Sequence, residues 1–323
     1  MTALDLFTPR VPRESFHPNF AALVNEEDDA VRAVLRDWAN GFIDRDGKFV
    51  QEFQRTFNSS WWELYLHAVL KSLGLRLDFD FAAPDFVMPD SGLAIEATIA
   101  SHAQGAMPEW QKTIKVLTRR DPIGGRYLEQ LARLSNSLDA KLRRYRKRYR
   151  YLPRVGDLAF VIAVQNFGTP DFFQLGDVAM QRLLYDVWDE NEFLKDGKTP
   201  LPTGLFRDAR MRDVSAVLYS SVATFGKARA LSASKGDFVF QAIRIRDNIE
   251  PIVIGAKLAD YRESLRDGLR LFHNPFAERP VPEGIFDVAD IRQFWFRDGD
   301  VESTCSPDGD LCMRQVMRIT SSP

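Results

Sequence analysis

The sequence predicts an α/β protein with a mixed central sheet flanked by helices, whose core follows the order helix, three strands, helix, strand (αβββαβ). Three observations predict this class. An apolar stripe with helical spacing precedes two short strands joined by a tight turn, a long helix follows them, and a continuous apolar run of strand length comes next. N-terminal helices and a C-terminal α+β extension complete the predicted architecture.

The first core helix is expected to run from Ser59 or Ser60 to Leu73, because its apolar residues recur with helical spacing. Glu63 lies one turn into this helix, beside the apolar stripe. Residues 1–54 are expected to form an N-terminal helical segment, irregular at first and helical from Asn25, which can serve as an N-cap.

Three short strands are expected after this helix: Leu75–Phe81, Asp85–Met88 and Leu93–Ile99. The turn Pro89-Asp90-Ser91-Gly92 pairs the last two strands. Asp85 begins one of them and Glu96 lies inside the other, so the pairing brings two carboxylates together on one edge. Like charges held this close are costly unless a cation or a shared proton offsets them. A hard divalent metal with oxygen ligands is the usual cation, so the acid pair predicts a metal site.

A long helix is expected from about Arg126 toward Arg150, and the run Leu158–Val164 has the continuous apolar character of a strand buried on both faces. We therefore expect a core over residues 55–170. The remainder, 171–323, is expected to form an α+β extension that either stands apart or packs on the same core. Its predicted elements are a helix at Asp171–Tyr185, strands at Val214–Ser220 and Phe238–Ile245, an exposed loop at Asn191–Thr203 and a weakly ordered segment at Asp298–Gly309.

Composition sets the general class of the protein. The chain has 323 residues, 45% hydrophobic and 27% charged, which is ordinary for a folded soluble protein. A net charge of −2 excludes a chain that is basic throughout, so binding of a polyanion would require a local basic patch. The two cysteines, Cys305 and Cys312, are too few for a disulfide framework. No histidine lies near them in the sequence, so a zinc site is not expected. No signal peptide or membrane-spanning run is evident, so we expect a cytoplasmic protein without membrane association.

The order of elements and the two acids resemble the PD-(D/E)XK nuclease superfamily, which includes the restriction endonucleases. Pro84-Asp85 matches the first motif of that family, and Glu96 in Ile95-Glu96-Ala97-Thr98 matches the second. Glu63 stands where many members carry a further acid on the first helix. The resemblance covers roughly residues 55–166, about a third of the chain. It implies a restriction-endonuclease-like fold and a Mg²⁺- or Mn²⁺-dependent nuclease, in which Asp85, Glu96 and Glu63 hold one or two ions with a backbone carbonyl near Ala97.

The sequence departs from the family pattern at Thr98, where the family has a lysine two residues after the second acid. Lys141 is the best substitute. Leu134, Leu138, Lys141 and Tyr145 share one helix face, so a lysine on this apolar stripe should point toward the sheet. Lys112 and Lys115 are weaker candidates because they fall in a less regular region, and His102 is expected to be only an exposed loop residue.

A basic run adjoins the proposed site and suggests contact with nucleic acid, with DNA favoured over RNA. Seven of the ten residues from Lys141 to Arg150 are basic, and apart from Lys141 the candidate phosphate contacts are Arg143, Arg144, Arg146, Lys147, Arg148 and Arg150. The interleaved Tyr145, Tyr149 and Tyr151 could stack on exposed bases. The alternative is a solvated helix end whose cations complement the helix dipole.

Three functions remain open on the sequence alone. The first is a Mg²⁺-dependent nuclease, which nuclease-like folds often perform as homodimers. The second is a nuclease-like fold that has lost catalysis and only binds nucleic acid, as Thr98 suggests. The third is an interaction or scaffold protein whose role lies in residues 171–323.

Overall fold

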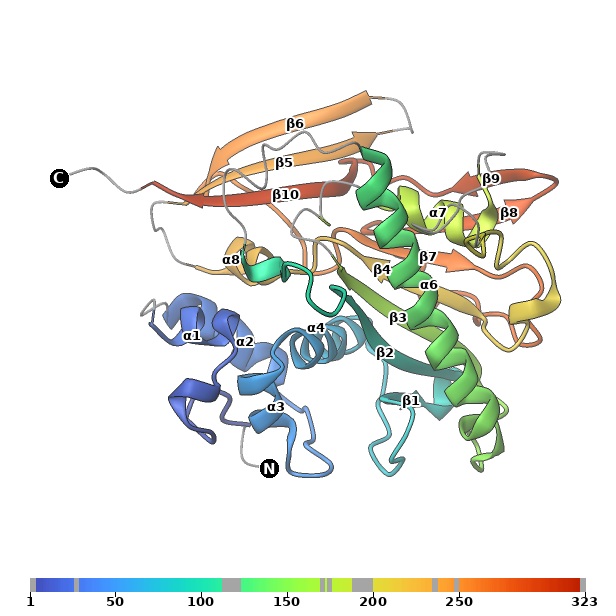
Figure 1. Cartoon of the computed structure of the whole chain (residues 1–323), viewed down its shortest axis with the longest axis horizontal. Helices are drawn as coiled ribbons and strands as arrows, with labels where there is room; N and C mark the ends of the chain where they lie inside the picture. The colour runs from blue at the N-terminus through green and yellow to red at the C-terminus, as the bar shows by residue number, and fades with distance from the viewer. Residues whose placement is uncertain are drawn as a thin grey trace.

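The fold is α/β, as the sequence predicts, with a seven-stranded sheet, helices on both of its faces and a separate three-stranded sheet (Figure 1). The computed structural model describes residues 4–25, 29–111, 123–168, 172, 176–187, 200–233, 238–246 and 250–319. The described α-helices are α1 Pro18–Asn25, α2 Asp29–Ala39, α3 Phe49–Arg55, α4 Asn58–Ser72, α6 Ile123–Lys147, α7 Val178–Tyr185 and α8 Phe225–Leu231. The described strands are β1 Phe86–Met88, β2 Leu93–Ser101, β3 Ala159–Phe167, β4 Ala216–Ser220, β5 Phe238–Arg246, β6 Glu250–Lys257, β7 Leu269–His273, β8 Ile291–Arg297, β9 Asp300–Ser303 and β10 Asp310–Arg318.

The main sheet is mixed, with the strand order β1-β2-β3-β4-β7-β8-β9. Strands β2, β3 and β4 run parallel, whereas β1 pairs antiparallel with β2 and β4 pairs antiparallel with β7. Four strands of the sheet come from residues beyond 170, so the predicted C-terminal extension contributes to the same sheet as the predicted core. The small sheet has the order β10-β5-β6. The division of the chain into separate domains stays a prediction.

Each face of the main sheet has its own hydrophobic core. Helix α4 packs on one face, against side chains such as Ile95 of β2, and α1 to α3 lie outside it in the same hydrophobic core (Figure 1). Helices α6 and α7 pack on the other face, against side chains such as Ala94. Because side chains alternate along a strand, Glu96 faces the α6 layer. Strand β3 is buried along its whole length, in agreement with its continuous apolar run. Trp62 fixes α4 to the sheet by donating its indole N–H to the Ala163 carbonyl at 3.0 Å.

The expected core elements occur close to their predicted bounds. Helix α4, the β1–β2 pair, helix α6 and strand β3 correspond to the predicted first helix, paired strands, long helix and apolar strand. In the extension, β4 and β5 correspond to the two predicted strands. In each of these segments, either the regular spacing of apolar residues or a turn sequence indicates the element.

The strand predicted at Leu75–Phe81 is wrong, so the described order is α4, β1, β2, α6, β3, with two strands rather than three between the helices. Leu75 and Leu77 pack on the core as the alternation suggests. Only one backbone hydrogen bond ties the segment to β1, from Asp78 N–H to the Val87 carbonyl at 2.8 Å. The Asp78 side chain accepts a hydrogen bond from Asp80 N–H at 2.9 Å and turns the chain away from the sheet.

Three further expectations differ from the structure. Asn25 is the last residue of α1 rather than an N-cap, so the region before it is partly helical. The segment Asp298–Gly309 contains β9 and is therefore more regular than expected. Helix α7 begins at Val178, later than predicted, and most of the loop expected at Asn191–Thr203 lies outside the described residues.

None of the helices in the described part of the chain is both long and apolar enough to cross a membrane.

Candidate active site

The two motif acids lie opposite each other at the edge of the main sheet. The pairing of Phe86 with Ile95 continues outward to place Asp85 across from Glu96. Asp85 Oδ2 accepts a hydrogen bond from the Ala97 N–H at 2.7 Å. Both acids lie on the face covered by α6, because residues opposite one another in an antiparallel pair point to the same side.

The turn between β1 and β2 fixes this register. Residues Pro89–Ser91 form a single 3₁₀ turn, which Gly92 ends at a φ of 64°. This left-handed conformation strains other residues but not glycine. The predicted turn sequence therefore does position the acid pair.

Glu96 is the centre of a buried polar cluster. Its side chain is 1% exposed, and its Oε1 atom accepts hydrogen bonds from Lys141 Nζ at 2.7 Å, Tyr149 Oη at 3.2 Å and Arg144 at 3.3 Å. Burial and the Glu96 carboxylate raise the pKa of Tyr149 to about 12, so its phenol keeps the proton that it donates. The Oε2 atom of Glu96 is buried and has no hydrogen-bond partner among the described residues.

Lys141 reaches the acid pair from α6, as the helix-face argument predicts. Its side chain is largely buried, and its ammonium group is in direct contact with Glu96. Thr98, at the family's lysine position, lies on the same face of β2 as Glu96 but carries no charge. The positive charge missing from β2 is therefore present on the helix packed above it. Lys112 and Lys115 lie outside the described residues.

Negative charge is crowded around Asp85. Burial first, and then the Glu96 carboxylate, raise the pKa of Asp85 to about 6. Burial and the Asp85 carboxylate raise the pKa of Glu63 to about 8. Lys141 opposes both shifts without cancelling them. Burial and repulsion between the acids thus favour the protonated forms of Asp85 and Glu63 when no cation is bound.

The donor set of Asp85 and Glu96 fits a hard divalent cation. Asp85 and Glu96 present carboxylate oxygens on one face, and Glu96 Oε2 is a buried acceptor that lacks a donor. Within the described ranges, however, no three His, Cys, Asp or Glu side chains are grouped in an arrangement that would hold a metal ion. Glu63 belongs to α4, whose apolar residues pack on the opposite face of the sheet from α6. Its role as a third ligand stays a prediction.

The basic run on α6 and the segment after it divides into paired and unpaired cations. Arg143 pairs with Asp139 at 2.6 Å, and Arg146 and Arg150 both contact Asp213, at 2.7 and 3.4 Å.

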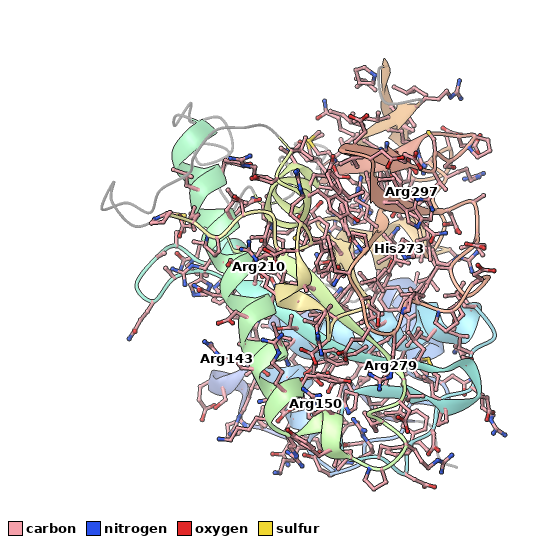
Figure 2. The ribbon with its side chains drawn as sticks, turned by 90° about the vertical axis from the view of Figure 1, so that its right-hand side faces the viewer. Arg143, Arg150, Arg210, His273, Arg279 and Arg297 are labelled. Carbon is pink, nitrogen blue, oxygen red and sulfur yellow. The ribbon has the colours of Figure 1, made fainter. Side chains whose placement is uncertain are left out.

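Lys147 and Arg148 are exposed and form no ion pair with any residue that the structure describes. Figure 2 shows Arg143 and Arg150 along this part of the chain, with Arg210 and Arg279 from later segments on the same side of the molecule. The run therefore offers fewer free charges than the sequence suggests.

The expectation that three tyrosines stack on bases is wrong for two of them. Tyr145 and Tyr149 are each 2% exposed. Tyr145 stacks on Phe160 with ring centroids 4.2 Å apart, and Tyr149 donates a hydrogen bond to Glu96. Tyr151 is 73% exposed, and its role in base stacking stays a prediction.

Two contacts of the site were not predicted from the sequence. The sequence pattern favours base stacking for Tyr149, which lies four residues beyond the inward-facing Tyr145 and also points inward in the structure. The sequence pattern favours phosphate binding for Arg144, which lies about one turn after Lys141 and contacts Glu96 in the structure. The helical period signals the position of Arg144, whereas Tyr149 lies in the 3₁₀ turn Tyr149–Tyr151 just after α6. His102 lies beside Trp110, with ring centroids 5.5 Å apart, and makes no contact with the acid pair.

No protein-family model, curated protein or solved structure matches this chain.

Proposed function

We propose that this protein is a metal-dependent nuclease of the PD-(D/E)XK type that hydrolyses phosphodiester bonds in nucleic acid, with DNA as the favoured substrate. The observation that carries the proposal is the placement of Lys141 Nζ 2.7 Å from Glu96, on the face where Asp85 stands opposite. Two acids and one lysine on a single face provide the charge types that this chemistry needs, even though the lysine comes from α6 rather than β2.

Each residue has a distinct role in this proposal. Asp85 and Glu96, with Glu63 as a further candidate, would hold Mg²⁺ or Mn²⁺, which lowers the pKa of a water molecule and offsets charge on phosphate oxygens. Lys141 brings a positive charge to the developing phosphorane, and its ion pair with Glu96 fixes its position. Tyr149 and Arg144 hold the Glu96 carboxylate in a single orientation.

The basic segment would hold the substrate beside this site. The unpaired cations Lys147 and Arg148 are placed to contact phosphates. Phosphates could also replace the surface ion-pair partners of Arg143, Arg146 and Arg150. Such contacts are independent of sequence and weaken with salt.

Thr98 favours a second candidate, a nuclease-like module that binds nucleic acid without cutting it. In that case Lys141 would only neutralise the buried Glu96. Both candidates predict binding, but only the first predicts a metal-dependent break in the chain.

A cleavage assay separates these candidates. Purified protein is incubated with supercoiled plasmid and with linear single strands, in Mg²⁺, in Mn²⁺ and in chelator. The nuclease proposal predicts cutting that requires the metal and is lost in Asp85→Ala and Glu96→Ala. Retardation of the substrate without cutting under every metal condition would establish the binding module instead, and absence of binding at low salt would leave the scaffold role.

A further inference from the structure

A second candidate site lies away from the acid pair, in a cavity with a volume of about 600 Å³. It opens beyond the carboxyl ends of the parallel strands β3 and β4, where α1, α4 and α8 approach the small sheet (Figure 1). Ligands of α/β proteins commonly bind at this end of parallel strands, and the volume falls in the range typical of small-molecule sites. We call it the aromatic cavity, and its lining includes Asn58, Trp61, Glu109, Trp110, Phe225 and Phe238.

The walls of the aromatic cavity suit a flat ring. Trp61 and Phe225 stack with ring centroids 6.0 Å apart, and Trp110 and Phe238 add half-buried aromatic faces. The indole N–H of Trp61 is already used, because it donates to the Ala223 carbonyl at 2.8 Å. Trp61 is also only 1% exposed, so it supports Phe225 from behind, and the half-buried rings are the surfaces open to a ligand. A planar ligand gains stacking energy on such surfaces.

One end of the cavity contains the Glu109 carboxylate, of which only one oxygen accepts hydrogen bonds from the described residues. Glu109 is 3% exposed. Its Oε1 atom accepts both available amide groups, from Asn58 Nδ2 at 2.6 Å and Asn19 Nδ2 at 2.9 Å. No described residue donates to Oε2. A ligand N–H that donates to this oxygen would form a charge-assisted hydrogen bond.

The other end of the cavity is basic. The Arg229 guanidinium lies over the Phe238 ring at 3.9 Å from its centroid, and the Arg318 guanidinium lies 5.8 Å from the same centroid. Arg318 is exposed and has no ion pair with the described part of the chain. Arg229 is only 1% exposed, so Arg318 is the guanidinium that a phosphate can reach, through paired N–H donors.

We propose that the aromatic cavity binds a purine nucleotide. The base lies between the aromatic walls and donates an N–H to Glu109 Oε2, and the phosphate lies against Arg318. Helix α4 contributes Asn58 and Trp61 to the cavity, whereas the acid pair lies at the edge of the sheet. The proposal does not depend on nuclease activity.

The Glu109→Gln variant tests the polarity of this site with little change in shape. The glutamine oxygen still accepts from Asn19 and Asn58, but an amide N–H replaces the one oxygen that lacks a donor. We expect wild-type protein in chelator to bind GMP or AMP in isothermal titration calorimetry, with affinity reduced roughly 10-fold or more in Glu109→Gln. Arg318→Ala should weaken GMP binding and leave guanosine binding unchanged, because guanosine lacks the phosphate.

Arg297→Ala is the matched control. Arg297 is also an exposed arginine near an aromatic ring, Trp295, at 5.5 Å, but it lies on β8 outside the cavity. The Arg297→Ala variant should bind GMP with the affinity of the wild type. If Glu109→Gln weakened the binding of single-stranded oligonucleotides but not of mononucleotides, the bound nucleotide would be part of a strand. Absence of binding by all these ligands up to about 1 mM, or equal binding by wild type and Glu109→Gln, would overturn the proposal.

Discussion

Asp85 and Glu63 keep their protons at pH values where ordinary carboxylic acids have lost them, with pKa values of about 6 and about 8. An acid whose pKa is raised by folding binds more protons in the folded state than in the unfolded state. The contribution of such an acid to the free energy of unfolding is complete below its pKa in the unfolded state. It is lost as the pH rises through its pKa in the folded state. Without a divalent ion, the folded protein therefore loses stability between about pH 4 and pH 8.

Asp85→Asn should remove part of this cost. The amide oxygen still accepts the Ala97 N–H, but the charge repelled by Glu96 is gone. We expect the free energy of unfolding in urea to rise by about 1 kcal/mol at pH 8 in chelator, and to change little at pH 4. Added Mn²⁺ should stabilise the wild type and not the variant. A variant less stable than wild type at pH 8 would contradict the charge-crowding account.

At the scale of the element, the basic segment at the end of α6 should have two classes of cation. Lys147 and Arg148 are free among the described residues, so replacing both with alanine should weaken binding to DNA of any sequence. The slope of the logarithm of the association constant against the logarithm of the salt concentration should fall in magnitude by about 2. Fluorescence anisotropy with a labelled duplex over a salt series measures this slope.

Arg146→Ala is the comparison within the same segment. Arg146 is already paired with Asp213, whose side chain is 7% exposed, so its loss should act mainly on stability, by about 1 kcal/mol. A salt slope changed more by Arg146→Ala than by the double variant would show that the ion pairs do not determine which cations reach the DNA.

The sequence predicted elements whose signals are local. Helices α4 and α6 show a clear apolar period, and the turn that ends at Gly92 specifies the β1–β2 pair. Lys141 could be assigned to the inner face because it lies on the α6 stripe. The same period did not reveal the role of Tyr149, because a tyrosine in a basic run also matches a nucleic-acid-binding pattern.

Other features depended on contacts that are distant in sequence. The alternation in Leu75–Phe81 shows which side chains are buried, but a strand also needs a partner, and β1 provides only one hydrogen bond there. The aromatic cavity joins residues from Asn19 to Arg318, so no local pattern could indicate it. Glu109 carries no local sequence signal, since its environment comes from Asn19 and Asn58.

At the scale of the whole molecule, a buried charge cluster links α8 to the small sheet. The Glu263 side chain is fully buried; its carboxylate pairs with Lys227 of α8 and with Arg314 of β10, the latter at 2.6 Å. Glu263→Gln would leave two buried cations without their shared anion. We expect a loss of about 3–5 kcal/mol in the free energy of unfolding, measured in urea.

The control for this cluster is Glu302→Gln, which removes an exposed partner of Arg297 and should change stability by less than about 0.5 kcal/mol. Equal effects of the two substitutions would show that the buried cluster does not hold the layers together.

The rate of plasmid cleavage by Lys141→Met tests the proposed active site most directly. The account predicts that wild-type protein cuts in Mg²⁺ and that Lys141→Met cuts roughly 10²- to 10³-fold more slowly, because the site loses its positive charge at the phosphate. Lys257→Met, on an exposed position of β6, should cut like the wild type. Failure of the wild type to cut, or equal rates for wild type and Lys141→Met, would contradict the account.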